Sequence, residues 1–433
     1  IEKSIDQVIN SFKKNKNKYD EVFIQPMLKS VQMSGVIFNC DIDTLSPYFI
    51  VNYDESGSTD SVTSGRGTSL KSFICFKKKK KIKNKKLNKI IKAAEECEKI
   101  FNYKYLDIEF AFSNNRLFLL QVRALVAKNK EDLSSLELSN NLNKLKKKIK
   151  KLNSHHPNLL GNKTIFSVMT DWNPAEIIGL RPKMLALSLY KELITDETWA
   201  YQRDNYGYRR LRSHPLLVSF LGIPFIDVRV SFNSFIPKSL DEKIASKLAN
   251  YYLNQLKKNL NKHDKVEFEI IFSCCHFSLN NKLSKLLNYK FTKLEIKLIE
   301  KSLLSLTNNI INVKNGLYKK DLEKSKILNQ KFFEIKNSQL SLIDKIYWLI
   351  KDVKRYGTLP FAGIARAAFI AVQILRSFVD AKILDEKEYD KFLNSLNTVS
   401  KQLSNDTNIL SKDKFLKIYG HLRPGTYDIL SPR

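Results

Sequence analysis

Four polar side chains that together could bind a cation and an anion lie in one short segment of this sequence, residues 107–125. Two are carboxylates, one is an amide and one is a guanidinium: Asp107, Glu109, Gln121 and Arg123. Carboxylate oxygens are the ligands that Mg²⁺ prefers, and arginine binds phosphate through paired hydrogen bonds. The set is therefore suited to magnesium together with a nucleotide polyphosphate.

The segment that carries these groups is predicted to be a β-hairpin. Apolar and polar residues alternate on both sides of residues 114–116, as they do in half-buried strands. Asparagine, present twice in the turn, tolerates the left-handed conformation that tight turns need. A three-residue turn there pairs Asp107 with Arg123 on one face. It also pairs Glu109 with Gln121 on that face, whereas a two-residue turn would separate the polar groups. The alternative is an ordinary two-sided hairpin with a solvated face and a surface ion pair.

The hairpin resembles part of a known family. Its Asp-Ile-Glu-Phe and Leu-Gln-Val-Arg segments, residues 107–110 and 120–123, resemble the end of an ATP-grasp nucleotide-binding domain. The family is that of pyruvate, phosphate dikinase, phosphoenolpyruvate synthase and rifampicin phosphotransferase, the PEP/pyruvate-binding enzymes. Residues 23–27 and 35–38 resemble its upstream Val-x-Gln-x-Met and Gly-Val-x-Phe motifs. The two motifs occur in the family's order, and the resemblance covers residues 20–125.

This resemblance implies an α+β fold and a division of the chain. Residues 1–128 are expected to be the C-terminal part of an ATP-grasp nucleotide-binding domain. A basic helix and linker follow at 129–163, and a mainly helical central domain, the expected substrate or linker domain, occupies 164–433. The chain begins at Ile1 without a methionine, so we interpret it as an internal fragment of a longer protein.

The resemblance also implies a function, that of an ATP-dependent phosphotransferase with ATP and Mg²⁺ as cofactors. Asp107 and Glu109 are expected to hold magnesium. The residues expected to contact ATP are Gln25, Glu109, Gln121 and Arg123. Phosphoryl transfer depends mainly on positioning and charge neutralisation. In the family the phosphoryl group passes through a histidine in a glycine-rich Ser-His context, which this sequence lacks. No catalytic residue is therefore expected here, and the fragment alone is expected to be inactive.

Two further segments bear on the resemblance. Residues 54–68 are rich in serine, threonine and glycine, and the backbone amides of such a loop can contact phosphate. The family usually has a Gly-Leu-Gly-Glu-like element there, which this chain lacks. Residues 419–428 resemble the family's Tyr-Gly-His-Arg element. His421 lies in that element but does not match the phosphorylated histidine.

Arginines and aromatic residues gather in the second region. Asn173 is predicted to cap a helix that Pro174 begins. Downstream, three arginines are candidate substrate ligands, since guanidinium groups near tyrosine and tryptophan suit an anionic or sugar-like molecule: Arg181, Arg203 and Arg209. The alternative is an aromatic seam between domains. The phosphoryl acceptor is expected to be a small molecule, pyruvate-like or larger.

The formal net charge of +30 raises a different class of function, nucleic-acid binding. Lysine runs such as 77–81 and 146–151 have no interleaved aromatic residues, which a base-stacking surface requires. No specific nucleic-acid partner is therefore expected. A Lys-rich nucleic-acid-binding protein remains one alternative to the enzyme, and a noncatalytic nucleotide-binding scaffold is the other. The oligomeric state stays open.

Cysteine usage and hydropathy bear on the compartment. The five cysteines have neither zinc-type spacing nor the density of a disulfide scaffold. No run approaches the roughly 20 apolar residues that a membrane span needs. A cytoplasmic protein without a membrane partner is expected.

Periodicity predicts the remaining elements. Alternation predicts strands at 21–28, 35–39, 48–53 and 225–231, and a period of 3.6 predicts a helix at 86–102. The region from 281 to 420 is predicted to be almost wholly helical, with helices near 292–312, 318–333, 338–355, 359–380 and 385–404.

Overall fold

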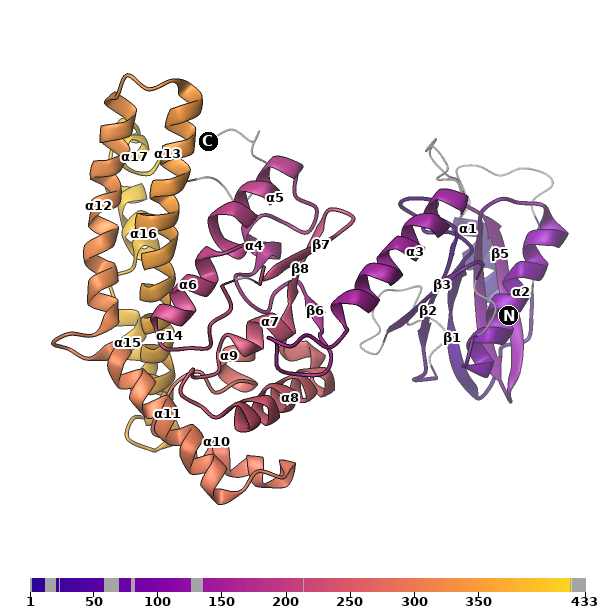
Figure 1. The fold of residues 1–433 in the computed structure, drawn as a ribbon. Coiled ribbons are helices and arrows are strands. Elements are labelled where there is room, and N and C mark those ends of the chain that lie inside the picture. Colours follow the sequence, from indigo (N-terminus) through magenta and orange to yellow (C-terminus); the bar gives the residue numbers. More distant parts are fainter. Residues whose placement is uncertain are drawn as a thin grey trace. The chain divides into compact units, whose positions relative to one another are not determined.

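The computed structural model describes two compact units, Ile1–Lys144 and Leu145–Arg433 (Figure 1). The residues it describes are 2–11, 21–57 apart from 23, 70–78, 82–125, 135–420 apart from 213, and 422. They form helices together with two antiparallel sheets. The predicted α+β class is thereby confirmed, whereas the ATP-grasp assignment and the domain limits at 128 and 163 stay predictions.

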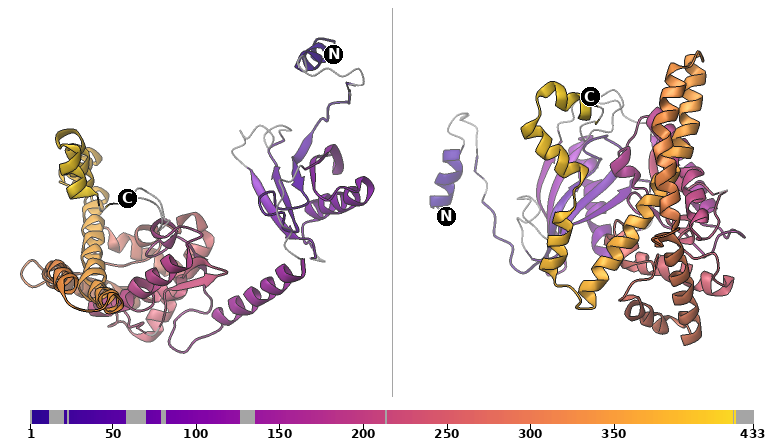
Figure 2. Two further views of the ribbon diagram at one scale, coloured as in Figure 1. Left: turned by 90° about the horizontal axis from the view of Figure 1, so that it is seen from above. Right: turned by 90° about the vertical axis from the view of Figure 1, so that its left-hand side faces the viewer.

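The first unit is built on a five-stranded antiparallel sheet with the strand order β3-β2-β1-β4-β5 (Figure 2). Its elements are α1 (Glu2–Ser11), β1 (Val31–Phe38), β2 (Tyr48–Asp54), β3 (Lys71–Phe76), α2 (Lys85–Phe101), β4 (Leu106–Ser113) and β5 (Arg116–Ala124). Helix α3 (Ser135–Leu152) follows, and the division between the units falls within it.

Helix α2 covers one face of this sheet. The Asn84 side chain caps its first turn by accepting hydrogen bonds from the backbone N–H groups of Lys86 and Leu87. Its buried apolar residues recur at helical spacing and pack against alternate strand residues such as Ile108 and Phe110. Because strand side chains alternate between faces, Glu109, which lies between these two residues, points away from α2.

The second unit contains a small sheet and many helices. The sheet has the order β6-β8-β7, with β6 (Phe166–Ser167), β7 (Leu217–Phe220) and β8 (Ile223–Asp227). The first helices are α4 (Pro174–Ile177), α5 (Met184–Tyr190), η1 (Lys191–Thr195), α6 (Thr198–Asn205), α7 (Val228–Asn233), α8 (Glu242–Lys258), η2 (Leu260–Lys262), α9 (Val266–Glu269), α10 (Leu279–Leu283) and η3 (Ser284–Tyr289). The later ones are α11 (Lys293–Ile311), α12 (Leu317–Asn337), α13 (Leu342–Asp352), η4 (Val353–Thr358), α14 (Leu359–Asp380), α15 (Glu386–Ser395), α16 (Val399–Ile409) and α17 (Lys412–Tyr419).

Three predicted elements are wrong. Residues 21–28, where described, form no strand, and Pro26, which has no N–H for a ladder, lies within this segment. The predicted strand at 225–231 ends at Asp227, because the Asp227 carboxylate accepts a hydrogen bond from the Val230 backbone N–H and caps α7. The predicted helix at 385–404 is two helices, since Thr398 caps α16 as a new helix.

One helical stretch bears on the expectation of no membrane partner. Among the described residues, Leu342–Asp380 is long and apolar enough to cross a membrane by length and composition. The core helix of a soluble protein passes the same test, so the observation weighs little. The expected absence of a membrane partner and the expected cytoplasmic location both stay predictions.

Candidate functional site

Strands β4 and β5 pair in the predicted register. Asp107 lies opposite Arg123, and Glu109 lies opposite Gln121. Arg123 Nη2 is 2.7 Å from Glu109 Oε1 and 3.2 Å from Asp107 Oδ2. The four polar groups therefore share the face of the sheet that points away from α2, and one guanidinium holds both carboxylates.

The predicted three-residue turn is wrong. Ser113 pairs with Arg116, which leaves only Asn114 and Asn115 between the strands. Both asparagines have positive φ, 49° and 60°. This is the backbone of a two-residue hairpin turn whose twist matches that of the flanking strands.

A β-bulge restores the register that the shorter turn would have shifted. Phe110 pairs with Leu119, but the next pair is Glu109 with Gln121. Leu120 is thus an extra residue on β5, and the side chains beyond it return to the face they would have had with a longer turn. Without the bulge, Gln121 would lie on the face that α2 covers.

The two carboxylates are partly shielded, and one of their oxygens is unpaired. The side chains of Asp107 and Glu109 are 19% and 23% exposed, whereas Arg123 is 50% exposed. Asp107 Oδ1 is buried and has no hydrogen-bond partner among the described residues. A buried oxygen of this kind is costly unless a donor or a cation satisfies it.

The same face carries an apolar row beside the polar groups. Phe38 lies opposite Asp107, Ile50 opposite Phe38, and Ile74 opposite Ile50. Ile74 is 62% exposed. This face is therefore charged at its β4–β5 edge and has an apolar row toward β3, beside the hydrogen-bonded pair of Ser72 and Asn52.

Other residues of the resemblance lie elsewhere or outside the described residues. Gln25 is exposed in a segment without helix or strand, and no described hydrogen bond links it to the hairpin. Most of the predicted phosphate loop, residues 58–68, lies outside the described residues, as does His421.

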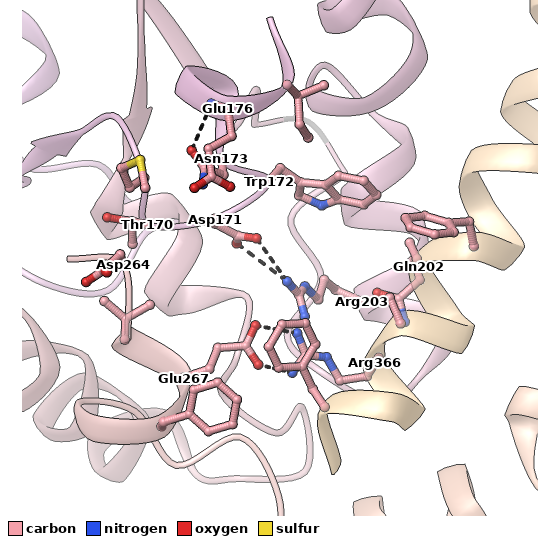
Figure 3. Close-up of a pocket in the computed structure, with 18 residues that line it drawn as sticks. Thr170, Asp171, Trp172, Asn173, Glu176, Gln202, Arg203, Asp264, Glu267 and Arg366 are labelled. Atoms are coloured by element: carbon pink, nitrogen blue, oxygen red, sulfur yellow. Dashed lines mark hydrogen bonds and ion pairs between the residues drawn. The ribbon is translucent and has the colours of Figure 1, made fainter. Parts of the chain in front are cut away.

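The second unit contains a pocket of about 390 Å³ (Figure 3). It is lined by residues 169–173 and by parts of α4, α6, α9 and α14. Asn173 caps α4 as predicted, since its side-chain oxygen accepts a hydrogen bond from the Glu176 backbone N–H at 3.2 Å. The tight bend before α4 puts Trp172 and Asn173 at φ values of 49° and 21°, a strained conformation for residues other than glycine.

Two buried ion pairs form the floor of this pocket. Arg203 Nη2 is 3.3 Å from Asp171 Oδ1, with both side chains at most 6% exposed. Arg366 holds Glu267 with both guanidinium Nη atoms, one of them 2.7 Å from Oε1. The two guanidinium groups also lie over the ring of Phe235, at 4.0 and 4.8 Å from its centroid.

Burial and pairing shift the pKa values of these groups. Burial raises the pKa of Asp171 above its usual value, and Arg203 opposes that shift. Burial also lowers the pKa of Arg203, with a further contribution from Arg366. For Glu267, burial acts to raise the pKa, but Arg366 outweighs it and the pKa lies below its usual value.

The structure does not gather the three candidate arginines in one place. Only Arg203 lines this pocket. Arg181 is exposed. Arg209 lies beside a different cavity and binds Glu242, with Nη2 3.0 Å from Oε1. Their role as substrate ligands stays a prediction.

Sequence reasoning missed Glu267 and Arg366, which are 99 residues apart. A signal for one of them is present, because Arg366 is a lone arginine in an apolar helical segment. Such a residue, when buried, needs a carboxylate partner. Nothing local identifies Glu267 as that partner.

Comparison with known proteins does not assign the chain to a family. No protein-family model matches the chain, and no curated protein sequence matches it either.

Proposed function

We propose that this chain is part of an ATP-dependent phosphotransferase and that the β4–β5 hairpin binds the magnesium-bound polyphosphate of ATP. The observation that carries the proposal is the convergence of Asp107, Glu109, Gln121 and Arg123 on one sheet face. The resemblance to the dikinase family supplies the rest: the phosphoryl group passes to a histidine and then to a small-molecule acceptor. No residue of this chain is assigned that transfer.

The donor set fits Mg²⁺. This ion is usually held by one or two protein carboxylates together with substrate phosphates and water. Asp107 and Glu109 supply two carboxylates, and Asp107 Oδ1 is a buried oxygen without a partner among the described residues. The described residues contain no cluster of three or more possible metal ligands, so phosphate oxygens and water would complete the coordination.

Arg123 has a different role from the carboxylates. In the free chain it holds both of them. Because Arg123 is half exposed, these ion pairs contribute little, about 0–1 kcal/mol each. A polyphosphate can therefore replace them with stronger paired hydrogen bonds from the guanidinium. The exposed amide of Gln121 lies opposite Glu109 and would orient the nucleotide by hydrogen bonding.

The apolar row suits the rest of the nucleotide. With the polyphosphate at the charged edge, the nucleoside would extend over Phe38, Ile50 and Ile74 on the same face. Burying apolar surface of Ile74, which is largely exposed, would add a favourable hydrophobic contribution. The polar and apolar parts of the face thus match the two parts of the ligand.

The test is a titration of the chain with a fluorescent ATP analogue in the presence and absence of Mg²⁺. We expect magnesium-dependent, saturable binding that Arg123→Ala weakens about tenfold or more, since a hydrogen bond to a charged group contributes about 1.5–3 kcal/mol. Arg116→Ala is the matched control, because it removes the same charge from the start of the same strand. Equal affinities for the two variants would contradict the proposal.

A further inference from the structure

The pocket of the second unit has no part in the nucleotide proposal, and its chemistry points to a ligand of its own. Both arginines that line the pocket already form ion pairs with carboxylates of the protein. Arg203 is paired with Asp171, and Arg366 is paired with Glu267 through two hydrogen bonds (Figure 3). Because each guanidinium is neutralised by a buried carboxylate, the floor offers no uncompensated positive charge to an anion.

Two further carboxylates make the pocket acidic. Glu176 and Asp264 line it, and both are exposed. Neither side chain makes an ion pair with any residue in the described part of the chain. The lining therefore favours a cationic ligand.

The walls of the pocket are aromatic. The rings of Trp172 and Phe361 lie 6.2 Å apart, and those of Phe268 and Phe369 lie 5.7 Å apart. All four residues line the pocket, and Phe361 is 61% exposed. An ammonium group is attracted to aromatic faces as well as to carboxylates, so the walls and the acidic groups favour the same kind of ligand.

Buried polar groups in the lining indicate that the ligand also carries oxygen atoms. Gln202 is 2% exposed and Thr170 is 6% exposed. Gln202 Nε2 and Thr170 Oγ1 have no hydrogen-bond partner among the described residues. The Nε atoms of Arg203 and Arg366 are also buried without a hydrogen-bond partner among the described residues. All four atoms can donate a hydrogen bond, and hydroxyl or carbonyl oxygens would satisfy them.

The backbone at the pocket is strained in a way that fits a binding site. Trp172 has a φ of 49°, which is rare for a bulky side chain. Strain of this kind persists where the surrounding structure enforces it, and it is frequent at ligand sites. Here the strained bend places the indole of Trp172 in the pocket wall opposite the floor of ion pairs.

We propose that this pocket binds a small hydroxylated organic amine, with the ammonium group held by Glu176, Asp264 and the aromatic walls. The oxygens of the ligand accept hydrogen bonds from the buried donors of Gln202 and Thr170. The volume of about 390 Å³ lies within the range of small-molecule sites. The proposal does not depend on nucleotide binding by the hairpin.

The test uses three sugars of similar shape and different charge: glucosamine, N-acetylglucosamine and glucuronate. Binding is followed through tryptophan fluorescence at slightly acidic pH, where glucosamine is charged. We expect saturable binding of glucosamine, about tenfold tighter than that of the neutral and anionic sugars, because two partly exposed ion pairs together contribute on the order of 1–2 kcal/mol. Trp172→Phe keeps an aromatic wall and should abolish the fluorescence change while binding persists in calorimetry.

The decisive variant is Glu176→Gln/Asp264→Asn, which should reduce the preference for glucosamine to less than about twofold. The double variant Glu95→Gln/Asp390→Asn removes the same charge from exposed positions outside the pocket and should keep the preference. The proposal is overturned if glucosamine does not bind, if glucuronate binds as tightly, or if the pocket and control variants behave alike.

Discussion

Buried charges dominate the chemistry of individual residues in the second unit. Arg366 is 4% exposed on α14, and Glu267 on α9 is its partner. A buried ion pair contributes little net stability, because desolvation opposes the attraction between the charges. Removing one partner is a different matter, since it leaves an uncompensated charge in the interior.

Glu267→Ala should therefore lower the free energy of unfolding of this unit by about 3–5 kcal/mol. Tryptophan fluorescence during urea unfolding measures it selectively, because the three tryptophans, Trp172, Trp199 and Trp348, all belong to the second unit. The double variant Glu267→Leu/Arg366→Met replaces the pair with apolar groups and should recover most of that loss. If the single and double variants are equally unstable, packing rather than charge explains the effect.

The titration of His276 should make the stability of the second unit depend on pH. Burial lowers its pKa to about 4; Lys282 adds to the shift, and Asp380 opposes it. In the unfolded chain the imidazole has a pKa near 6.5, so between pH 6.5 and pH 4 it binds a proton that the folded chain does not bind. The free energy of unfolding should thus fall as pH decreases from about 6.5 to about 4, by at most about 1.4 kcal/mol per unit from this group.

The measurement is the difference between the natural chain and His276→Asn across that pH range. Asparagine can keep the contact that His276 Nδ1 makes with Ser278 Oγ at 3.2 Å, but it does not titrate. Subtracting the two profiles removes the contribution of the carboxylates. A difference that stays constant from pH 6.5 to pH 4 would show that the histidine is not responsible.

Glu109 is the hairpin residue whose replacement best separates the proposed magnesium binding from folding. Glu109→Gln keeps the shape of the side chain but removes one of the two carboxylates that we assign to magnesium. In the proposed phosphotransferase, this change should lower magnesium-dependent ATP turnover by a factor of about 100 or more, in keeping with the loss of one transition-state contact. Glu95→Gln on the exposed side of α2 is the control, and it should leave turnover unchanged.

Among the elements, the hairpin has one feature that the sequence predicts, its strand pairing, and one that it does not, its turn. Alternation predicts the pairing of Glu109 with Gln121 correctly, because one face of β4 has to pack against α2. It does not predict how the register arises. A three-residue turn and a two-residue turn with a bulge at Leu120 both place Gln121 and Arg123 on the face of Asp107 and Glu109. The positions of these polar residues therefore cannot distinguish the two turns.

The turn itself is testable through Asn115, which has a φ of 60°. Asn115→Gly should keep or slightly increase the protection of the β4–β5 amides from hydrogen exchange, since glycine adopts this conformation freely. Asn115→Val should reduce the stability of the hairpin by about 1–2 kcal/mol, the cost of a left-handed β-branched residue. Mass spectrometry of peptides covering residues 106–124 reports the exchange. Equal exchange in the two variants would argue against this turn geometry.

The pocket is an arrangement of elements that sequence alone does not reveal. Asp171 and Arg203 are 32 residues apart, and Glu267 and Arg366 are 99 apart. Their pairing results from the packing of α6, α9 and α14, for which no local periodicity is diagnostic. Asn173, by contrast, acts within four residues of chain, and its role as a helix cap is predicted correctly.

For the whole molecule, the formal net charge of +30 is the property most open to experiment. The lysines of the run 146–151 in α3 are exposed, and Lys148 Nζ donates a hydrogen bond to the Ser219 carbonyl oxygen at 2.6 Å. In the other run, Lys77 is partly buried and pairs with Glu98. Residues 79–81 of the other run lie outside the described residues. Charge on this scale supports solubility and weak, nonspecific association with polyanions.

Binding of the chain to DNA or RNA should therefore lose most of its affinity between low and physiological salt and show no sequence preference. Exposed lysines bind phosphates by releasing counterions, so salt competes with them directly. Replacing Lys146–Lys148 with glutamine should reduce the slope of log affinity against log salt, whereas magnesium-dependent nucleotide binding should not change. A salt-resistant complex with one preferred sequence would instead favour a nucleic-acid-binding protein over the enzyme, because such selectivity needs contacts to base edges that charge alone does not provide.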